Sequence, residues 1–151
     1  MDSKWDLRFL GLACHIAGWS KDPSTKAGAV VVKERRVLSL GYNGFPMGID
    51  DDPALYEDRE AKYIRVVHAE ANALLLGGTD LRGATLYTWP FMSCSRCAGL
   101  VIQAGIMRHV SLFTEDEEHL DRWGEPPMLT KEMLGDAGVQ IKLYPNLEDK
   151  L

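Results

Sequence analysis

Strands and helices alternate along this chain, and that alternation is the feature that most constrains its fold. Short runs of β-branched and aromatic residues predict strands. Longer stretches with apolar residues three or four positions apart, or with strong helix formers throughout, predict the helices. This order is typical of an α/β protein with a mixed sheet of about five strands covered on both faces. The expected strands are Ala27–Lys33, Val37–Tyr42, Thr85–Trp89, His109–Phe113 and Gln140–Tyr144, and the expected helices are Trp5–Trp19, Ala54–Tyr63, His68–Leu76, Cys94–Ala104 and Pro127–Ala137.

Connection lengths add to this prediction. Only the polar turn Glu34-Arg35 separates the first two strands, so we expect an antiparallel hairpin. The later strands are separated by helices, so we expect helical crossovers between them. A chain of 151 residues can bury one core unaided, and we expect a single domain over residues 1–151.

Charge and hydropathy exclude several classes of function. The formal net charge is −5, which disfavours a surface built to bind DNA or RNA phosphates. The longest apolar runs, Ala27–Val32 and Ala73–Leu76, are too short to span a bilayer. Residues 1–7 carry no apolar segment typical of a secretory signal. We therefore expect a cytoplasmic protein without membrane or nucleic-acid partners.

The three cysteines, Cys14, Cys94 and Cys97, do not form the pattern of a disulfide framework. Cys94 and Cys97 are three residues apart, so they share one face of the helix that they begin. His68 begins the preceding helix, with one strand between the two. If these helices pack side by side, the three side chains meet at one point.

One imidazole and two thiolates suit Zn²⁺, and the exposed N–H groups at helix N-termini favour the thiolate form. Three protein ligands leave a fourth position for water, as in catalytic zinc sites. A fourth ligand from Cys14 or His15 would make a closed structural site instead, and this alternative stays open.

Glu70 lies two residues after His68 and is the candidate for proton transfer. Two thiolates cancel the formal charge of Zn²⁺, so a carboxylate that accepts and returns the proton of water supplies what the metal lacks. The alternative is a carboxylate placed in a first helical turn because the helix dipole favours it there.

The order His68-Ala69-Glu70 and then Cys94-Ser95-Arg96-Cys97 resembles the H-x-E and P-C-x-x-C signature of zinc-dependent nucleobase deaminases. The chain departs from the signature at one position, because Ser93 and not proline precedes Cys94. The nearest upstream proline is Pro90. We therefore expect the loop before the cysteine pair to differ in shape, while the ligand types and their spacing are intact.

Further segments extend the resemblance over nearly the whole chain, and the family that they resemble is the deoxycytidylate (dCMP) deaminases. The loop GYNG, with an Asp cluster after it, points to the deoxynucleotide branch of the superfamily. The matching segments, in order, are DPSTKAGAVVV at Asp22–Val32, GYNGFPMG at Gly41–Gly48, HAEANALL at His68–Leu75, CSRCAGLVIQAGI at Cys94–Ile106 and DAGV at Asp136–Val139.

The resemblance implies a three-layer α/β/α, cytidine-deaminase-like fold and the hydrolytic conversion of dCMP to dUMP. It implies His68, Cys94 and Cys97 as zinc ligands and Glu70 as the proton shuttle. It also implies a homohexamer, activation by dCTP and inhibition by dTTP at a second site, and Mg²⁺ as the companion of such a triphosphate. Some members carry a second, structural zinc, but Cys14 is the only cysteine left over here, so we expect one zinc per chain.

Substrate contacts are expected from three places. Asn43 in GYNG is expected to contact the sugar or phosphate, the alternative being a left-handed turn residue before Gly44. Backbone groups at Ala69 and around Trp89 and Pro90 are expected to hold the pyrimidine edge.

Ser24, Thr25 and Lys26 open the first expected strand and are the candidates for a phosphate cradle, with Lys26 as the charge partner. The alternative for Lys26 is a solvated side chain beside the strand.

Other functions stay open at this point. A deaminase that accepts both dCMP and dCTP differs from the first interpretation only in phosphate number. A tRNA adenosine deaminase shares both motifs but is disfavoured by the acidic composition. A non-catalytic zinc protein that senses nucleotides is disfavoured by the intact Glu70.

Overall fold

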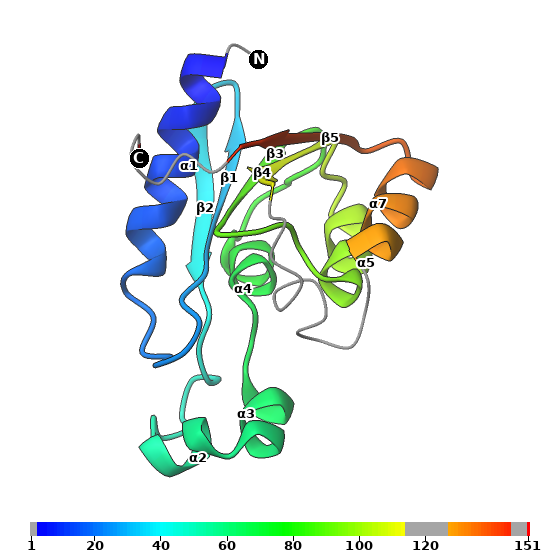
Figure 1. Ribbon diagram of the computed structural model, residues 1–151. Helices are drawn as coiled ribbons and strands as arrows, with labels where there is room; N and C mark the ends of the chain where they lie inside the picture. Colours follow the sequence, from blue (N-terminus) through cyan, green and yellow to red (C-terminus); the bar gives the residue numbers. More distant parts are fainter. Residues whose placement is uncertain (1–2, 114–126, 146–150) are drawn as a thin grey trace.

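The computed structural model describes residues 3–113, 127–145 and 151 of the chain. Its centre is a five-stranded sheet in the order β2-β1-β3-β4-β5 (Figure 1). β1 pairs antiparallel with β2 and β3, whereas β3, β4 and β5 run parallel. The elements are α1 (Ser3–Ala17), β1 (Gly28–Lys33), β2 (Arg36–Tyr42), α2 (Pro53–Glu57), α3 (Arg59–Arg65), α4 (Ala69–Leu76), β3 (Thr85–Trp89), α5 (Ser95–Gln103), β4 (Arg108–Leu112), α7 (Pro127–Asp136) and β5 (Gln140–Tyr144).

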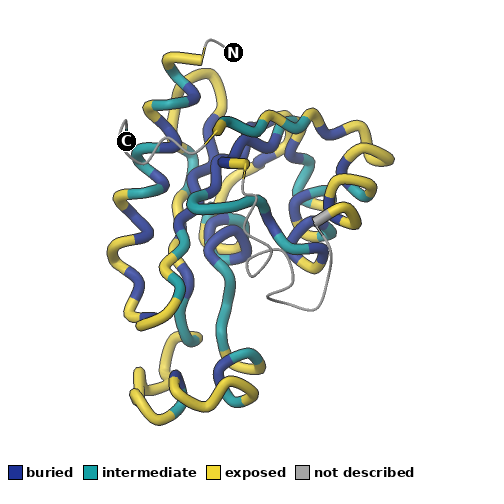
Figure 2. The backbone as a smooth tube through the Cα atoms, viewed as in Figure 1, coloured by how far each residue is buried: buried dark blue, intermediate teal, exposed yellow. Residues whose placement is uncertain are grey.

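The predicted α/β class is confirmed, and the three layers follow from two separate cores. Residues of β1 alternate between them: Val30 and Val32 pack on the α1 side, and Ala29 and Val31 pack on the side of α4, α5 and α7. Because this strand is buried on both faces, it has the continuous apolar run seen in the sequence. Figure 2 shows the buried backbone concentrated in the sheet and on the helix sides that face it.

The predicted hairpin is confirmed. β1 and β2 pair antiparallel with Lys33 opposite Arg36. Glu34 and Arg35 form the two-residue connection and both adopt positive φ, 53° and 63°. This backbone is typical of the type I′ turn, whose twist matches that of the two strands.

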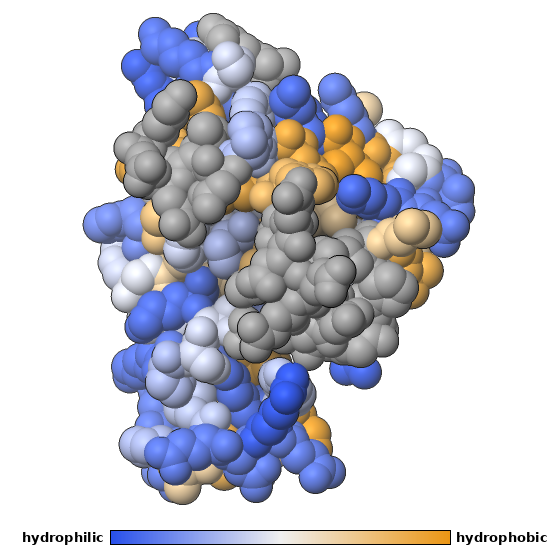
Figure 3. Space-filling view, in the orientation of Figure 1, coloured by the Kyte–Doolittle hydropathy of each residue, from blue (hydrophilic) through white to orange (hydrophobic). Residues whose placement is uncertain are grey.

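The segment predicted as one helix over Ala54–Tyr63 is two short helices instead, and that prediction was wrong. Asp58 has extended backbone at φ −80° and ψ 104°, which ends α2, and its carboxylate then accepts the Ala61 N–H to begin α3. An aspartate competes for the backbone in this way because its short side chain caps the next helix. The α2–α3 region lies below the sheet and its visible surface is mainly hydrophilic (Figures 1 and 3).

One buried ion pair ties α1 to the sheet. Asp6 on α1 is fully buried and accepts two hydrogen bonds of 2.7 Å from the Arg108 guanidinium on β4. Tyr87 on β3 and Tyr144 on β5 donate to the same carboxylate, at 2.7 and 2.6 Å. Asp6 therefore joins one helix to three strands. Within the residues described, no helix combines the length and apolar character needed to cross a bilayer.

Candidate metal centre and active-site pocket

Three donor atoms from two neighbouring helix starts converge at one point. His68 Nδ1, Cys94 Sγ and Cys97 Sγ all lie within 4.8 Å of one another. His68 is the N-cap residue of α4, and Cys94 is the N-cap residue of α5, one position outside the helices predicted to begin with them. Cys97 lies in the first turn of α5. The convergence predicted from spacing is therefore present.

Close packing of α4 on the sheet places His68 and Glu70. Gly41 on β2 lies against the backbone of this helix: a Cβ added there would come within 2.5 Å of Ala73 N and 2.6 Å of Ala69 O. Only glycine avoids this overlap, because it has no Cβ. A larger residue at position 41 would push the beginning of α4, and with it the donor atom of His68, away from the cysteines.

The donor set fits a zinc ion. Zn–N bonds of about 2.0–2.1 Å and Zn–S bonds of about 2.3 Å at tetrahedral angles place nitrogen and sulfur about 3.6 Å apart. His68 Nδ1 is 3.5 Å from Cys94 Sγ and 3.3 Å from Cys97 Sγ. Cys14 and His15 lie on α1, which packs on the opposite face of the sheet, so neither is placed to close the site as a fourth ligand.

Hydrogen bonding among His68, Cys94 and Cys97 favours the thiolate form of Cys94. The Cys97 thiol donates to Cys94, and this contact, with a smaller contribution from His68, lowers the pKa of Cys94 to about 4. The same contact with Cys94 raises the pKa of Cys97. Contact with Cys94 also raises the pKa of His68. A divalent cation would displace these shared protons and bind the deprotonated ligands.

Glu70 lies beside this cluster in the first turn of α4, where it is buried. Its Oε1 is 3.8 Å from His68 Nδ1, and its Oε2 accepts a 3.0 Å hydrogen bond from Ser93 Oγ. Burial raises the pKa of Glu70, and the contacts with His68 and Ser93 oppose this only in part. A carboxyl group whose pKa is raised in this way holds a proton more readily, which suits a group that accepts and releases one.

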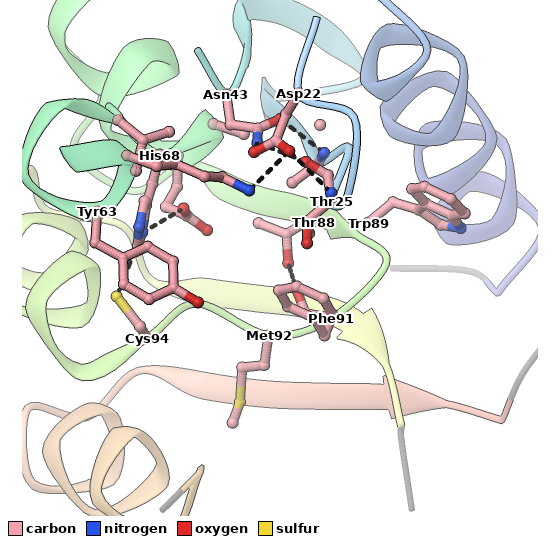
Figure 4. A pocket seen from close by; sticks show the side chains of 16 residues that line it. Asp22, Thr25, Asn43, Tyr63, His68, Thr88, Trp89, Phe91, Met92 and Cys94 are labelled. Atoms are coloured by element: carbon pink, nitrogen blue, oxygen red, sulfur yellow. Dashed lines mark hydrogen bonds and ion pairs between the residues drawn. The ribbon is translucent and has the colours of Figure 1, made fainter. Parts of the chain in front are cut away.

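A pocket lies beside Glu70 and two of the candidate metal ligands, His68 and Cys94 (Figure 4). His68 and Cys94 lie at one end, Asp22 and Asn43 along one side, and Phe91 and Met92 opposite them. Of the residues predicted to contact substrate, the lining includes Thr25, Asn43, Ala69 and Trp89. Residues of the lining that the sequence did not single out are Asp22, Ala27, Gly28, Lys62, Tyr63, Val66, Thr88, Phe91 and Met92.

Three predicted contact residues are not part of this lining: Ser24, Lys26 and Pro90. The Lys26 ammonium donates to the Ser20 carbonyl. The hydroxyl of Ser24 accepts a 2.6 Å hydrogen bond from Lys62. Their contacts with substrate stay predictions.

Asn43 is built into the pocket wall. Its Oδ1 accepts the Ala27 N–H at 2.9 Å and its Nδ2 donates to the Thr25 carbonyl at 2.8 Å. It is not among the non-glycine residues with positive φ, so the alternative of a left-handed turn residue was wrong. Asn43 holds the loop that carries Thr25 in place, and Thr25 Oγ1 is a buried oxygen without a hydrogen-bond partner among the described residues.

Lys62 is the cation of the pocket lining, and sequence reasoning missed it. Its ammonium lies 2.8 Å from Asp22 Oδ1, and both side chains are buried. Burial raises the pKa of Asp22, but the hydrogen bonds from Lys62, Ser24 and Thr25 outweigh it and lower the pKa overall. Asp22 and Lys62 are 40 positions apart, so no local pattern could have revealed the pair.

The family model for the cytidine and deoxycytidylate deaminase zinc-binding region matches residues 3–113. Among curated proteins, an uncharacterized deaminase in the luxG 3′ region of Aliivibrio fischeri is 41% identical over 145 residues, which is 96% of this chain and 97% of that protein. A probable deoxycytidylate deaminase of Drosophila melanogaster is 37% identical over 93% of this chain and 72% of its own length. The Homo sapiens deoxycytidylate deaminase is 37% identical over 77% of this chain and 67% of its own length.

Solved structures show the same fold at lower identity. The dCMP deaminase of cyanophage S-TIM5, solved in complex with dCMP and dUMP, aligns with a TM-score of 0.71 and 22% identity over 95% of this chain and 98% of that one. RibD of Acinetobacter baumannii aligns with a TM-score of 0.63 and 21% identity, over 94% of this chain and 35% of that protein. Both alignments cover nearly the whole of this chain, so they include the three-layer arrangement that surrounds the pocket.

Proposed function

The chain belongs to the cytidine and deoxycytidylate deaminase zinc-binding family, and from this premise we propose that it hydrolyses dCMP to dUMP and ammonia with a bound zinc ion. A deaminase is a hydrolase that acts on the C–N bond of its base. The observation that carries the proposal is the convergence of His68, Cys94 and Cys97 beside the buried carboxylate of Glu70. Relatives named deoxycytidylate deaminase at 37% identity support dCMP as the substrate.

We assign His68, Cys94 and Cys97 as the zinc ligands. A zinc ion held by these three side chains would act as a Lewis acid and make water a better nucleophile at neutral pH. Glu70 Oε1 faces the ligands, so it is placed to take a proton from the attacking water and deliver it to N3 of the cytosine. As the C4–N bond breaks, Glu70 passes the remaining proton of the former water to the amino group. The products are a C4 carbonyl and ammonia, and the carboxylate returns to its starting state.

The remaining lining has two chemical halves. Ala69, Trp89 and Phe91 give the lining apolar surface, which suits the pyrimidine ring. Thr25 and Lys62 lie toward the polar side with Asp22 and suit the sugar phosphate. Asp22 and Ser24 accept from two of the three N–H donors of Lys62, and the third, which has no acceptor among the residues described, is available to a ligand. We therefore propose Lys62 as the phosphate partner, beside the earlier candidate Lys26.

Replacing each lysine by methionine decides between them. We expect Lys62→Met to lower kcat/KM for dCMP about tenfold or more relative to unphosphorylated deoxycytidine, because a charge-assisted hydrogen bond contributes about 1.5–3 kcal/mol. Lys26→Met should leave the ratio of the two kcat/KM values unchanged. This ratio is independent of the fraction of folded enzyme, so any destabilisation caused by the unpaired Asp22 cancels. A shift in the ratio for Lys26→Met alone would reverse the assignment.

A substrate panel tests the function itself. Ammonia release is measured from dCMP, dCTP, deoxycytidine and tRNA, each supplied alone, on protein of known zinc content. We expect release from dCMP, its loss after chelation of zinc, and its return when zinc is restored. Comparable release from dCTP would indicate the dual-specificity alternative, and release from tRNA alone would overturn the proposal. No release from zinc-loaded protein would favour the nucleotide-sensing alternative.

The finer properties expected from the resemblance and from the composition stay predictions for this chain. They are activation by dCTP, inhibition by dTTP, Mg²⁺ as a companion of the effector, assembly as a homohexamer, one zinc per chain, a cytoplasmic location and a single domain over residues 1–151. Repeating the panel with each effector tests the first two of these, and measuring the mass of the assembly in solution tests the fourth.

A further inference from the structure

We propose that Ser93 is a positioning residue for Glu70, and that His109 holds Ser93 in the orientation required. This inference rests on the proposed role of Glu70 as the proton carrier. It concerns the one position at which the chain departs from the signature of zinc nucleobase deaminases, where proline directly precedes the first cysteine.

A serine in place of proline adds two hydrogen-bond donors at a buried position. Proline has neither a backbone N–H nor a side-chain hydroxyl, whereas serine has both. Ser93 is only 4% exposed, so water does not easily satisfy these groups. A buried donor left without an acceptor costs about 1–3 kcal/mol. The substitution is therefore tolerable only where the fold supplies two acceptors.

The fold supplies both acceptors. The Ser93 backbone N–H donates to His109 Nε2 at 3.2 Å, and the Ser93 hydroxyl donates to Glu70 Oε2 at 3.0 Å. The acceptors come from different elements, since His109 lies on β4 and Glu70 on α4. Ser93 thus links the sheet to the carboxylate through two hydrogen bonds.

Contacts on the other side of the ring orient His109. Its side chain is fully buried, and its Nδ1 lies 3.2 Å from the Leu86 carbonyl on β3. A carbonyl only accepts, so Nδ1 carries the proton and Nε2 is the acceptor for Ser93. Burial lowers the pKa of His109 to about 4, which keeps the ring in this neutral form at neutral pH. Each donor on the path from Leu86 to Glu70 therefore has an acceptor: His109 Nδ1–H, the Ser93 backbone N–H and the Ser93 hydroxyl.

The two oxygens of Glu70 have different surroundings because of Ser93. Oε2 accepts the hydrogen bond from the Ser93 hydroxyl, while Oε1 faces the candidate metal ligands, 3.8 Å from His68 Nδ1. Without the anchor, the carboxylate can rotate about its terminal torsion, which has a broad and soft energy profile. Holding one oxygen keeps the other in the position for proton transfer before substrate binds.

A double-mutant cycle between Ser93 and Glu70 is the first test. Ser93→Ala removes the hydroxyl but keeps the backbone N–H. We expect kcat for dCMP to fall about tenfold, with KM changed less than about twofold and zinc content unchanged, because orientation of the base matters in the transition state. In Glu70→Gln protein the same change should lower the residual kcat by less than about twofold. An equal loss in both backgrounds would overturn the proposal.

A second cycle tests His109. His109→Leu removes the acceptor and leaves the Ser93 N–H unpaired, so we expect kcat to fall about tenfold. In Ser93→Pro protein, which has no N–H at this position, His109→Leu should have little further effect on kcat. A tenfold loss in both would mean that His109 acts by another route. If His109→Leu does not fold, His109→Gln is measured by itself: its amide oxygen can accept the same N–H, so most of kcat should be retained, and a tenfold loss would contradict the role of His109.

Ser111→Ala is the matched control. Ser111 is a fully buried hydroxyl on the same strand as His109, and it donates to the Thr88 carbonyl at 2.9 Å without contacting Glu70. Its removal should lower the thermal midpoint of unfolding as Ser93→Ala does but leave kcat within about twofold of the unmodified protein. A loss of kcat as large as that of Ser93→Ala would mean that any buried hydroxyl here has this effect.

A crystal structure of Ser93→Ala gives a result that needs no substrate. We expect the Glu70 carboxylate to lose its single orientation, with Oε1 displaced from His68 Nδ1. An unchanged carboxylate would overturn the inference even if dCMP is deaminated. Failure of the unmodified protein to release ammonia from dCMP would instead overturn the proposed function, so the two failures are distinguishable.

Discussion

Glu70→Gln should lower kcat for dCMP by about two to four orders of magnitude while zinc binding is retained. General acid–base catalysis by a positioned side chain contributes a factor of about this size. Glutamine has nearly the shape of glutamate, and its amide oxygen can still accept the Ser93 hydroxyl, so the side chain should stay in place. The amide cannot accept a proton from water, and therefore proton transfer is the step that is lost.

The measurement is steady-state ammonia release by Glu70→Gln protein with zinc determined on the same sample. Glu60→Gln is the matched control, because Glu60 is also a carboxylate in the first turn of a short helix, α3, but is exposed and outside the pocket. If both residues served only the helix dipole, both changes would have the same small effect. Near-normal turnover by zinc-replete Glu70→Gln protein would reject the shuttle role.

Asp6→Ala should lower the free energy of unfolding by about 3–5 kcal/mol, the usual result of breaking a buried ion pair by removing one partner. Arg108 would keep its charge next to the buried sheet, and the hydroxyls of Tyr87 and Tyr144 would lose their shared acceptor. Because Asp6 joins α1 to three strands, the loss is global. Denaturant unfolding followed by circular dichroism measures it.

The same carboxylate makes stability depend on pH. Burial raises the pKa of Asp6, but the hydrogen bonds from Arg108, Tyr144 and Tyr87 outweigh it, so the pKa lies below its ordinary value of 3.8. A lowered pKa in the folded state stabilises the protein fully above the unfolded value, and this stabilisation is lost as the pH falls through the folded value. The difference in unfolding free energy between unmodified and Asp6→Asn protein should therefore be constant from pH 7 to 5 and shrink below about pH 4.

Two controls separate this effect from general acid sensitivity. Tyr144→Phe removes one donor and keeps the ion pair, so it should cost only about 0.5–1.5 kcal/mol. Asp80→Ala removes an exposed carboxylate paired with Arg82, and it should leave the unfolding midpoint nearly unchanged. A loss for Asp6→Ala no larger than that for Tyr144→Phe would contradict the prediction.

Much of the fold could be predicted from local sequence. The strands Thr85–Trp89 and Gln140–Tyr144 have the predicted bounds, because a run of β-branched and aromatic residues has few other ways to bury itself. The wrong prediction over Ala54–Tyr63 has an equally local cause. Helix propensity favours one continuous helix there, but the Asp58 side chain bonds to the backbone and starts a new one.

The candidate metal ligands were readable from the sequence by itself, since one histidine and two cysteines at helix starts form a donor set that suits zinc. The hydrogen-bond partners of the other residues around the site were decided by the tertiary structure alone. Lys62 meets Asp22 across 40 positions, and Ser93 meets both Glu70 across 23 and His109 across 16. Such contacts depend on which strands become neighbours and how closely the helices pack on them. Hydrogen bonds act over about 3 Å, so their partners are set by that packing and not by spacing along the chain.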